Sequence, residues 1–370
     1  MKICLINNLY KPYNRGGAER VVEAMADDYA RKGDEVFIIT TRPSFRITNY
    51  KLRIKNLSDR DKIFHIPGFY YNLAKLPFPL RLIWHVWDMF DFISYFRVKK
   101  ILKKEKPDLV ITHNLKGIGY LIPRLIKRLG VAHHHYLHDI QLIYPSGLLY
   151  YGEEKKLNSA PARIYQQICV RLFSSPDKVI SPTNWLMDLH GERGFFKRSK
   201  LEIKEFLTGG NELRIKNCEL RIKNAGKAFK FLFVGQVERH KGVEMLIKAF
   251  SGLKAKAELL IIGDGSFLPS LKGKAGDEPR IKFLGRKSPE EVEKLMSESD
   301  CLIVPSLCWE NAPAVIYEAY RAGLPVIASR IGGIPEIIAK LGGELFTPGN
   351  IMELEKLMNK AYVQKKNEVL

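Results

Sequence analysis

The chain has 370 residues, 46% of them apolar, with 60 Lys and Arg against 40 Asp and Glu and a net charge of +20. This length exceeds one ordinary core and is typical of two α/β domains. No uninterrupted apolar run reaches about 18 residues, and the start MKICLINN is broken too soon for a signal peptide, which excludes a spanning helix and a secreted protein. We therefore expect a cytoplasmic protein.

The positive charge leaves three classes of partner open: nucleic acid, an anionic membrane face and phosphorylated substrates. The sequence has no zinc-finger, RNP or helix-turn-helix pattern, and its charge is spread along the chain. We therefore expect no nucleic-acid binding. A generally basic surface is the simplest interpretation, and anionic small molecules or lipids are the next.

The first predicted strand, residues 3–6, leads through the loop NNLYKPYNRGGAER into a helix over residues 18–31. Gly16 and Gly17 precede this helix, where glycine lets the backbone approach a phosphate or a sugar closely. Most glycine pairs are ordinary turns, so this pair needs support from other motifs.

A second strand is predicted over residues 35–40, and an irregular basic segment follows it to about residue 67. Near-copies of the word LRIKN occur at residues 51–56, 212–217 and 219–224. Copies this far apart do not form a solenoid repeat. We interpret them as inserted surface segments, because they fall where the pattern predicts a connection.

A very aromatic and then strongly basic segment covers residues 69–106. Arg81, His85, Asp88 and Asp91 interrupt its apolar residues, which excludes a spanning helix. The preferred interpretation is helices that pack on the first sheet, because buried aromatic residues are the commoner case. The alternative is a partly exposed amphipathic surface that contacts membrane lipid.

Two predicted strands end in a histidine and a second polar residue. The strand over residues 108–112 precedes His113 and Asn114, and the strand over residues 131–137 precedes His138 and Asp139. Four histidines lie in or after the later strand: His133, His134, His135 and His138. Neighbouring side chains of a strand point to opposite faces, so this run cannot converge on one metal ion.

The first domain ends with a strand over residues 178–181 and a helix over residues 185–190. The second domain begins with a strand over residues 230–234, which leads into GQVERHKGVEMLIKAF. Without further motifs, the simplest interpretation of Lys241 in this segment is an exposed lysine at the start of a helix.

A strand over residues 259–262 is followed by Gly263, Asp264 and Gly265. This G-x-G pattern lacks the third glycine and the downstream acidic residue of a dinucleotide fingerprint. We therefore expect no NAD.

The stretch over residues 301–338 predicts a strand, a helix and a second strand, with loops at the carboxyl ends of parallel strands. Glu310 precedes the helix, which we expect to open near Asn311 or Ala312, and Glu318 lies inside it. Two helical turns separate the carboxylates, so they cannot share one proton and are placed to grip two parts of one elongated ligand. The amides that open the helix favour an anion or sugar oxygens. The alternative for an isolated Glu pair is a solvated helix face.

The run PSLCWENAPAVIYEA, followed by GLPVIAS and GGIPE, resembles the donor-binding signature of retaining glycosyltransferases of the GT-B fold, family GT4. The segments GGAER, PDLVITHN, LHDIQLIYP and GQVERHKG match further parts of the family pattern. The resemblance implies an α/β fold of two Rossmann-like domains that face a central cleft. It places an acceptor-side domain at residues 1–200 and a nucleotide-sugar domain at residues 229–345. A linker with inserted repeats joins them at residues 201–228, and residues 346–370 form a C-terminal helix and tail that are short for the family.

The resemblance also implies roles for individual residues. Glu318 holds the ribose of the donor, Glu310 and the adjoining amides of Asn311 and Ala312 hold the transferred sugar, and His138 lies beside that sugar. The family binds the donor diphosphate with an Arg and a Lys; Lys241 matches, whereas Gln236 replaces the Arg and Arg239 is the nearby cation. Further candidates for donor binding are Gly16, Gly17, Gly263 and Gly265. Candidates on the acceptor side are His113, Asn114 and Asp139.

The implied activity is transfer of a sugar from a nucleoside-diphosphate sugar to a glycan, lipid-linked or small-molecule acceptor, in cell-envelope polysaccharide or glycolipid synthesis. His138 and Glu310 are the expected catalytic residues, with no metal and no further cofactor. Contact with an anionic membrane would place the protein at the inner face of the cell membrane. The alternatives are a nucleotide-sugar epimerase or a phosphorylase on the same fold, or a catalytically impaired protein that binds nucleotide-sugars.

Overall fold

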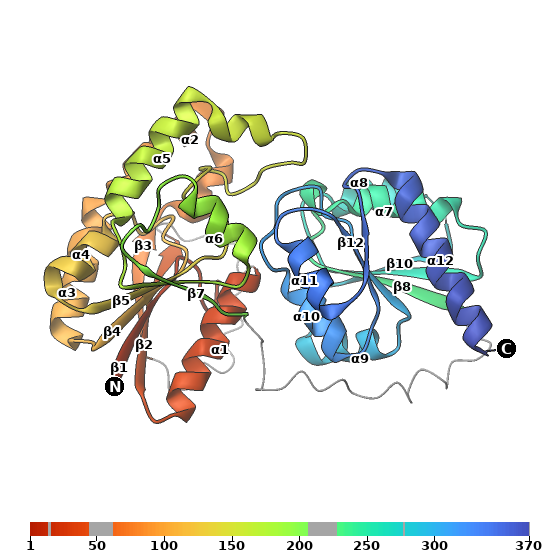
Figure 1. Ribbon diagram of the computed structural model, residues 1–370, viewed down its shortest axis with the longest axis horizontal. Coiled ribbons are helices and arrows are strands. Elements are labelled where there is room, and N and C mark those ends of the chain that lie inside the picture. The colour runs from red at the N-terminus through yellow and green to blue at the C-terminus, as the bar shows by residue number, and fades with distance from the viewer. Residues whose placement is uncertain (14–15, 44–61, 206–227, 277, 370) are drawn as a thin grey trace. The chain divides into compact units, whose positions relative to one another are not determined.

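The computed structural model describes residues 1–13, 16–43, 62–205, 228–276 and 278–369 (Figure 1). They form two compact units, each built around one parallel sheet; the N-terminal unit takes residues 1–147 and 155–209, and the C-terminal unit takes residues 148–154 and 210–370. The three LRIKN copies lie outside the described residues. None of the helices in the described ranges is long and apolar enough to cross a membrane.

The N-terminal unit has a seven-stranded sheet in the order β3-β2-β1-β4-β5-β6-β7, with all strands parallel. Its strands are β1 Lys2–Ile6, β2 Glu35–Pro43, β3 Lys62–Gly68, β4 Leu109–Thr112, β5 Ala132–Tyr136, β6 Lys178–Ser181 and β7 Lys200–Ile203. The central strands read as short apolar runs because helices cover both faces of a parallel sheet. Ile3, Leu5, Ile38 and Ile111 form its core with Val22 of a covering helix.

The helices of this unit are α1 Gly17–Arg31, α2 Phe78–Met89, α3 Phe92–Glu105, α4 Ile122–Leu129, α5 Ala160–Phe173 and α6 Asn184–Gly191. Short 3-10 helices cover Tyr70–Lys75 and Glu154–Asn158. The predicted first helix is confirmed as α1, which buries Val21, Val22 and Ala26 as its 3.6-residue period requires.

Strand β3 differs from the expectation of an irregular segment up to residue 67. Its sequence KIFHIPG pairs with β2 and lies at the edge of the described sheet. An edge strand tolerates Pro67, which lacks a backbone donor, and needs no continuous apolar run. The strand pattern therefore cannot be recognised from alternation or from apolar content.

The aromatic segment forms α2 and α3, but the expectation that its aromatic side chains pack on the sheet is wrong for four of them: Trp87, Phe90, Phe92 and Phe96. Tyr95, Val98 and Leu102 are buried. Trp87 and Phe96, in contrast, are 63% and 61% exposed. Each helix thus carries an apolar face that the sheet does not cover.

The C-terminal unit has a six-stranded parallel sheet in the order β10-β9-β8-β11-β12-β13. Its strands are β8 Phe229–Val234, β9 Ala257–Ile262, β10 Ile281–Gly285, β11 Cys301–Val304, β12 Val326–Ser329 and β13 Glu344–Phe346. Its helices are α7 Val243–Gly252, α8 Leu268–Ala275, α9 Pro289–Ser297, α10 Ala314–Arg321, α11 Ile334–Leu341 and α12 Ile351–Val369. Figure 1 shows α12 (dark blue) beside α7, where Leu354 and Met358 enter the core of this unit.

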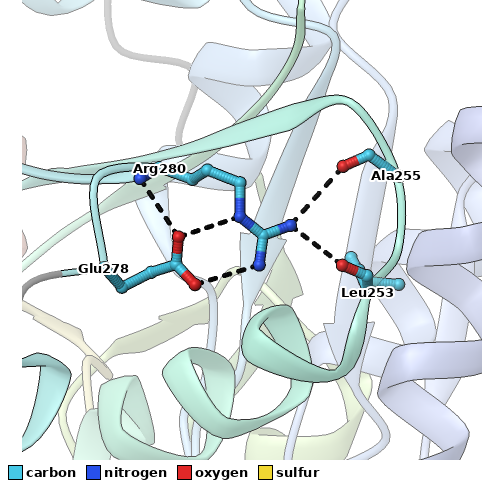
Figure 2. A network of polar contacts seen from close by, with 4 residues as sticks. All are labelled: Leu253, Ala255, Glu278 and Arg280. Carbon is cyan, nitrogen blue, oxygen red and sulfur yellow. Dashed lines mark hydrogen bonds and ion pairs between the residues drawn. The ribbon is translucent and has the colours of Figure 1, made fainter.

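Arg280 ties two connections of this sheet together, as Figure 2 shows. Its guanidinium binds both carboxylate oxygens of Glu278, at 2.9 and 3.0 Å, and donates to the carbonyl oxygen of Leu253 at 2.9 Å and that of Ala255 at 3.5 Å. The same group lies over the ring of Phe250, 5.0 Å from its centroid. The turn that enters β10 is thereby fixed to the connection that follows α7.

Candidate functional site

Four neighbouring strands of the C-terminal unit, β9, β8, β11 and β12, deliver their following loops to one edge of the sheet. Parallel strands place all their carboxyl ends at the same edge, where open α/β sheets bind ligands. These loops carry the predicted donor-binding residues of this unit.

Glu310 and Lys241 meet at this edge although 68 residues separate them in the sequence. Lys241 Nζ lies 2.9 Å from Glu310 Oε2, and the hydroxyl of Ser306 donates to Glu310 Oε1. The two charged side chains are 25% and 14% exposed. This ion pair is therefore largely shielded from solvent but open enough for a ligand to reach.

The pair is charged at neutral pH. Burial acts to raise the pKa of Glu310, but the attraction of Lys241 and the hydrogen bond from Ser306 outweigh burial and hold this pKa below its ordinary value. Burial acts to lower the pKa of Lys241, and the Glu310 carboxylate more than compensates, so this pKa is raised. Each partner thus stabilises the charge on the other.

The backbone around Glu310 is fixed by a glycine that no other residue can replace without strain. Gly332 has φ of +61°, and a Cβ there would lie 2.1 Å from the carbonyl oxygen of Glu310. The amide of Gly333 donates to that same oxygen at 2.8 Å. The turn after β12 therefore packs backbone against backbone on the loop after β11, which explains the GGIP motif.

Helix α10 begins at Ala314, and its N-cap is Pro313. The expectation that the helix opens near Asn311 or Ala312 is therefore wrong, because proline disfavours helical geometry in the residue before it. The buried Asn311 and the half-buried Ala312 belong to the loop. Glu318 lies half-buried inside α10, as predicted.

The diphosphate candidates of this unit separate in the structure. Lys241 joins Glu310, whereas the guanidinium of Arg239 lies over the ring of Phe267, 4.7 Å from its centroid. Gln236 is exposed in the loop after β8. Arg239 thus contacts the neighbouring loop, which follows β9.

Gly263 and Gly265 let two loops approach each other. A Cβ at Gly263 would lie 1.7 Å from the carbonyl oxygen of Gly235, and a Cβ at Gly265 would lie 2.3 Å from that of Val237. The amide of Val237 donates to Asp264 at 2.9 Å. These glycines hold the loop that carries Gln236 against the loop after β9.

A segment far away in the sequence supports the loop that leads to Glu310. Residues 148–154 belong to the C-terminal unit, and Tyr150 forms an antiparallel bridge with Cys308. The amide of Trp309 donates to Leu149 at 2.8 Å, and the amide of Tyr151 donates to Leu307 at 2.9 Å. Nothing in the sequence pattern predicts this pairing, because the segment forms a single isolated bridge and has no strand signal.

In the N-terminal unit, two predicted histidines are hydrogen-bonded to each other. His113 Nδ1 lies 2.8 Å from His138 Nε2, and the two residues follow the neighbouring strands β4 and β5. His113 is 1% exposed and stacks on Tyr136, whereas His138 is half-buried. We therefore expect His113 to orient His138 and not to touch an acceptor.

Burial makes this pair neutral at physiological pH. It lowers the pKa of His138 to about 4 and that of His113 well below its ordinary value. Burial also raises the pKa of Asp139 to about 6, although the amide of Gln141, at 2.7 Å, and the charge of Lys116 oppose the shift. A neutral imidazole can donate or accept a hydrogen bond at a sugar hydroxyl without adding charge.

The remaining candidates of this unit lie in the first loop and helix or form hydrogen bonds with the first loop. The amide of Gly16 donates to the carboxylate of Glu19 at 2.8 Å, and Gly17 is the first residue of α1. Asn114 is joined to the first loop, because its amide donates to Asn7 Oδ1 at 3.1 Å and its carbonyl accepts from Asn8 at 2.9 Å.

Two histidines of the run on β5 form hydrogen bonds to the neighbouring strand β4. His133 Nε2 and His135 Nδ1 lie 2.8 and 2.9 Å from the hydroxyl of Thr112. In the described ranges, no three His, Cys, Asp or Glu side chains come together as metal ligands would.

Sequence reasoning did not assign three residues that complete these sites. Ser306 bonds to Glu310, Gly332 fixes its backbone, and the buried Lys116 donates to the carbonyl of Pro145 at 2.9 Å near Asp139. The first two stand in the PSLCWE and GGIPE motifs, so motif position was the available signal. Lys116 gave none, since a loop lysine is ordinarily exposed.

Two curated relatives cover most of the chain. An uncharacterized 42.6 kDa protein in the cps region of Klebsiella pneumoniae is 29% identical over 345 residues, which are 91% of this chain and 87% of the relative. The Escherichia coli UDP-Gal:alpha-D-GlcNAc-diphosphoundecaprenol alpha-1,3-galactosyltransferase is 25% identical over 297 residues, which are 75% of this chain and 68% of the relative.

Solved structures share the fold over nearly the whole chain. Sucrose-phosphate synthase from Thermosynechococcus elongatus has a TM-score of 0.71 at 18% identity and covers 99% of this chain and 90% of its own. Anabaena Alr3699/HepE in complex with UDP has a TM-score of 0.67 at 20% identity and covers 99% of this chain and 91% of its own.

Two family models divide the chain between them. The model for Glycosyltransferase Family 4 matches residues 15–203, and the model for Glycosyl transferases group 1 matches residues 219–368. The first alone spans half of the chain, and the second takes most of the rest. The family expected from the motifs is thereby confirmed, and the chain belongs to the GT4-type glycosyltransferases of the GT-B fold.

Proposed function

We propose that this chain moves a sugar, with retention of configuration, from a nucleoside-diphosphate sugar to a glycan, lipid-linked or small-molecule acceptor in cell-envelope polysaccharide or glycolipid synthesis. The observation that carries the proposal is the Glu310–Lys241 ion pair at the carboxyl edge of a parallel sheet. Two likenesses support the substrate classes: HepE was solved with UDP, and the E. coli relative is named for a UDP-Gal donor and a diphosphoundecaprenol acceptor.

Lys241 is the cation proposed for the donor diphosphate. An ammonium carries three N–H donors, so Lys241 can bind Glu310 and a phosphate oxygen at the same time. Negative charge develops on the diphosphate as its bond to the sugar breaks, and a cation already held in place stabilises that charge. We propose on this basis that neither a metal ion nor another cofactor is required.

Glu310, Glu318 and His138 have separate roles in the proposal. Glu310 and the amides of Asn311 and Ala312 hold the sugar that is transferred, and Glu318 binds the ribose hydroxyls. His138 is a neutral hydrogen-bonding group for the sugar, which its pKa of about 4 supports. The acceptor oxygen attacks on the face that the diphosphate leaves, so no carboxylate of the protein acts as nucleophile.

The proposal includes peripheral contact with an anionic membrane at the inner face of the cell membrane. The net charge of +20 supports this contact, because basic proteins are attracted to anionic lipid headgroups. A lipid-linked acceptor would be met at such a surface.

The roles of the two carboxylates can be distinguished by kinetics. A panel of nucleotide-sugars is first screened for thermal stabilisation and for transfer, in the presence of a chelating agent. With the best donor, Glu310→Gln should lower kcat by about a hundredfold, since it removes a charged contact where charge develops. Glu318→Gln should mainly raise the donor KM, because a ribose contact acts equally before and during the reaction.

The control is Lys254→Gln, which removes an exposed lysine of the connection between α7 and β9, before the start of a strand, and should change neither constant. Wild-type kcat in Glu310→Gln, with the donor still stabilising the protein, would contradict the role of the ion pair. Activity that appears only after magnesium is restored would contradict metal independence and leave sugar transfer itself intact. Release of free sugar or epimerised donor without transfer would favour the other enzyme classes.

A further inference from the structure

Helices α2 and α3 (orange in Figure 1) leave a large set of apolar side chains exposed in the N-terminal unit. Six of them define what we call the α2–α3 surface, each at least half exposed: Ile83, Val86, Trp87, Phe92, Ile93 and Phe96. Soluble proteins expose single apolar residues routinely, but six large exposed ones on two consecutive helices indicate an interaction site.

The spacing of these residues follows one face of each helix. Ile83 and Val86 or Trp87 lie three or four positions apart on α2, and Phe92 and Phe96 lie four apart on α3. The opposite face of α3 carries the buried Tyr95, Val98 and Leu102. Each helix therefore has an exposed apolar stripe, and α3 has a buried apolar stripe as well.

The same face of α3 continues into positive charge. Arg97, Lys100, Lys103 and Lys104 are exposed along the second half of the helix, and Arg81 is exposed on α2. The acidic residues of these helices do not offset this positive charge at the surface. Asp88 and Glu105 are buried, and Asp91 caps α3 by accepting a hydrogen bond from the amide of Ser94. The exposed face of this helix pair thus carries basic charge next to aromatic side chains.

The surface is held in place by buried polar contacts. Both carboxylate oxygens of Asp88, at the end of α2, accept from the amide of Gly117 at 2.8 and 2.9 Å. Gly117 lies in the loop that follows β4 and His113. The end of α2 is consequently fixed to the loop that carries His113.

We propose that the α2–α3 surface docks onto an anionic lipid bilayer. Aromatic and aliphatic side chains of such a helix face enter the boundary between headgroups and acyl chains, and exposed Lys and Arg beside them attract anionic headgroups. A protein partner would be expected to meet the basic stripe with acidic residues and to close over the aromatic cluster. The bilayer is favoured because apolar and basic residues follow one another along a single helix face, as an interfacial helix requires.

This inference specifies the membrane contact of the proposed function but is independent of the sugar-transfer chemistry. Vesicle binding needs no donor and no acceptor. Failure of the vesicle experiment would leave the donor-side kinetics unaffected, and an inactive enzyme could still bind vesicles.

The experiment is co-sedimentation of the full chain with vesicles of phosphatidylglycerol mixed into phosphatidylcholine, compared with phosphatidylcholine alone. We expect binding to the anionic vesicles. The double variant Trp87→Ser/Phe96→Ser should weaken this binding about tenfold or more, because it removes two large interfacial side chains. The triple variant Arg97→Gln/Lys100→Gln/Lys103→Gln should weaken it about a hundredfold, at about fivefold for each basic residue.

Matched controls remove the same chemistry elsewhere. Ile164→Ser/Met352→Ser changes two exposed apolar residues of α5 and α12, and Lys254→Gln/Lys256→Gln/Lys272→Gln removes three exposed charges of the C-terminal unit. Both controls should bind vesicles as the wild type does. Because every substituted side chain is exposed, circular dichroism should show the fold unchanged in each variant.

Three results would overturn the proposal. The first is wild-type binding that does not depend on anionic lipid, and the second is equal loss in the control variants. The third is a surface that joins two copies of the chain: light scattering would then detect a dimer that Trp87→Ser/Phe96→Ser disperses while vesicle binding stays unchanged.

Discussion

Glu310 and His138 are each held by a partner side chain that positions them. Lys241 Nζ lies 2.9 Å from Glu310 Oε2, and His113 Nδ1 lies 2.8 Å from His138 Nε2. A side chain fixed before its ligand arrives loses little freedom on binding, and this preorganisation lowers the barrier to reaction. We therefore expect these partners to matter for rate, although one of them is too deeply buried to touch a substrate.

His113 is the clearer case of a positioning residue. His113→Ala removes the hydrogen bond that holds His138 Nε2, so kcat should fall by up to about a hundredfold while the donor KM changes little. His113→Asn keeps a polar group near the former Nδ1 position and should restore part of the rate. Steady-state kinetics on folded protein provides the measurement.

A double-mutant cycle with His138→Ala tests whether the two histidines act together. If His113 works through His138, the double variant should be no slower than His138→Ala alone. Losses that multiply would assign His113 an independent role. The matched control is His190→Ala, another buried histidine of the same unit, which should lower the Tm and leave kcat near the wild-type value.

At the level of elements, apolar runs predicted the central strands and missed β3, β7 and β13 at the edges of the sheets. Strands β1, β4, β8 and β11 bury nearly every residue, so their sequences are short apolar runs that the pattern detects. The polar edge strand β7 carries the sequence KLEI, with at most partial burial. Edge strands pair on one side only and need less apolar surface, so their sequences resemble loops.

A connection between elements also contributes to stability through Arg280. Its guanidinium joins Glu278, Leu253 and Ala255 (Figure 2), so Arg280→Gln should lower the free energy of unfolding of the C-terminal unit by about 1 to 2 kcal/mol. A loss of this size lowers the Tm by roughly 2 to 8 °C. Thermal unfolding should show this shift, with kcat retained. The control Arg286→Gln, at an exposed position just after β10, should leave the Tm unchanged.

At the scale of the whole molecule, the sequence motifs predicted the candidate site residues but not which of them contact each other. Motifs identified Glu310 and Lys241 separately, but their contact depends on β8 and β11 being neighbours in the sheet. The same holds for His113 and His138, which meet because β4 pairs with β5. The contact of residues 148–154 with the C-terminal unit has no local signal at all, since it is made by backbone groups of an irregular segment.

The two units also differ in how they should respond to acid. Eight of the nine histidines lie in the N-terminal unit. Burial lowers the pKa of all eight, to about 4 for His85, His138 and His190 and to about 3 for His133. Burial also raises the pKa of two carboxyl groups, to about 7 for Asp88 and about 6 for Asp139.

As the pH falls, the histidines and the aspartates change the free energy of unfolding in opposite directions. A histidine that stays neutral in the folded unit binds a proton only on unfolding, so its contribution is present above pH 6.5 and is lost as the pH falls toward 4, at up to about 1.4 kcal/mol per pH unit. The two aspartates act the other way, because they bind protons in the folded state while the unfolded chain is still ionised. Eight histidines with a lowered pKa outnumber the two aspartates, so the N-terminal unit should lose stability between pH 6.5 and 4.

Urea unfolding followed by tryptophan fluorescence can isolate this unit. Trp309→Phe leaves tryptophans only in the N-terminal unit, at Trp84, Trp87 and Trp185. The midpoint should fall steadily from pH 6.5 to 4.5, and adding His190→Gln should reduce that dependence, because one proton fewer is taken up on unfolding. A midpoint that is flat over this range would mean that the buried aspartates cancel the histidines. An unchanged slope in the His190→Gln background would mean that His190 titrates alike in the folded and unfolded chain.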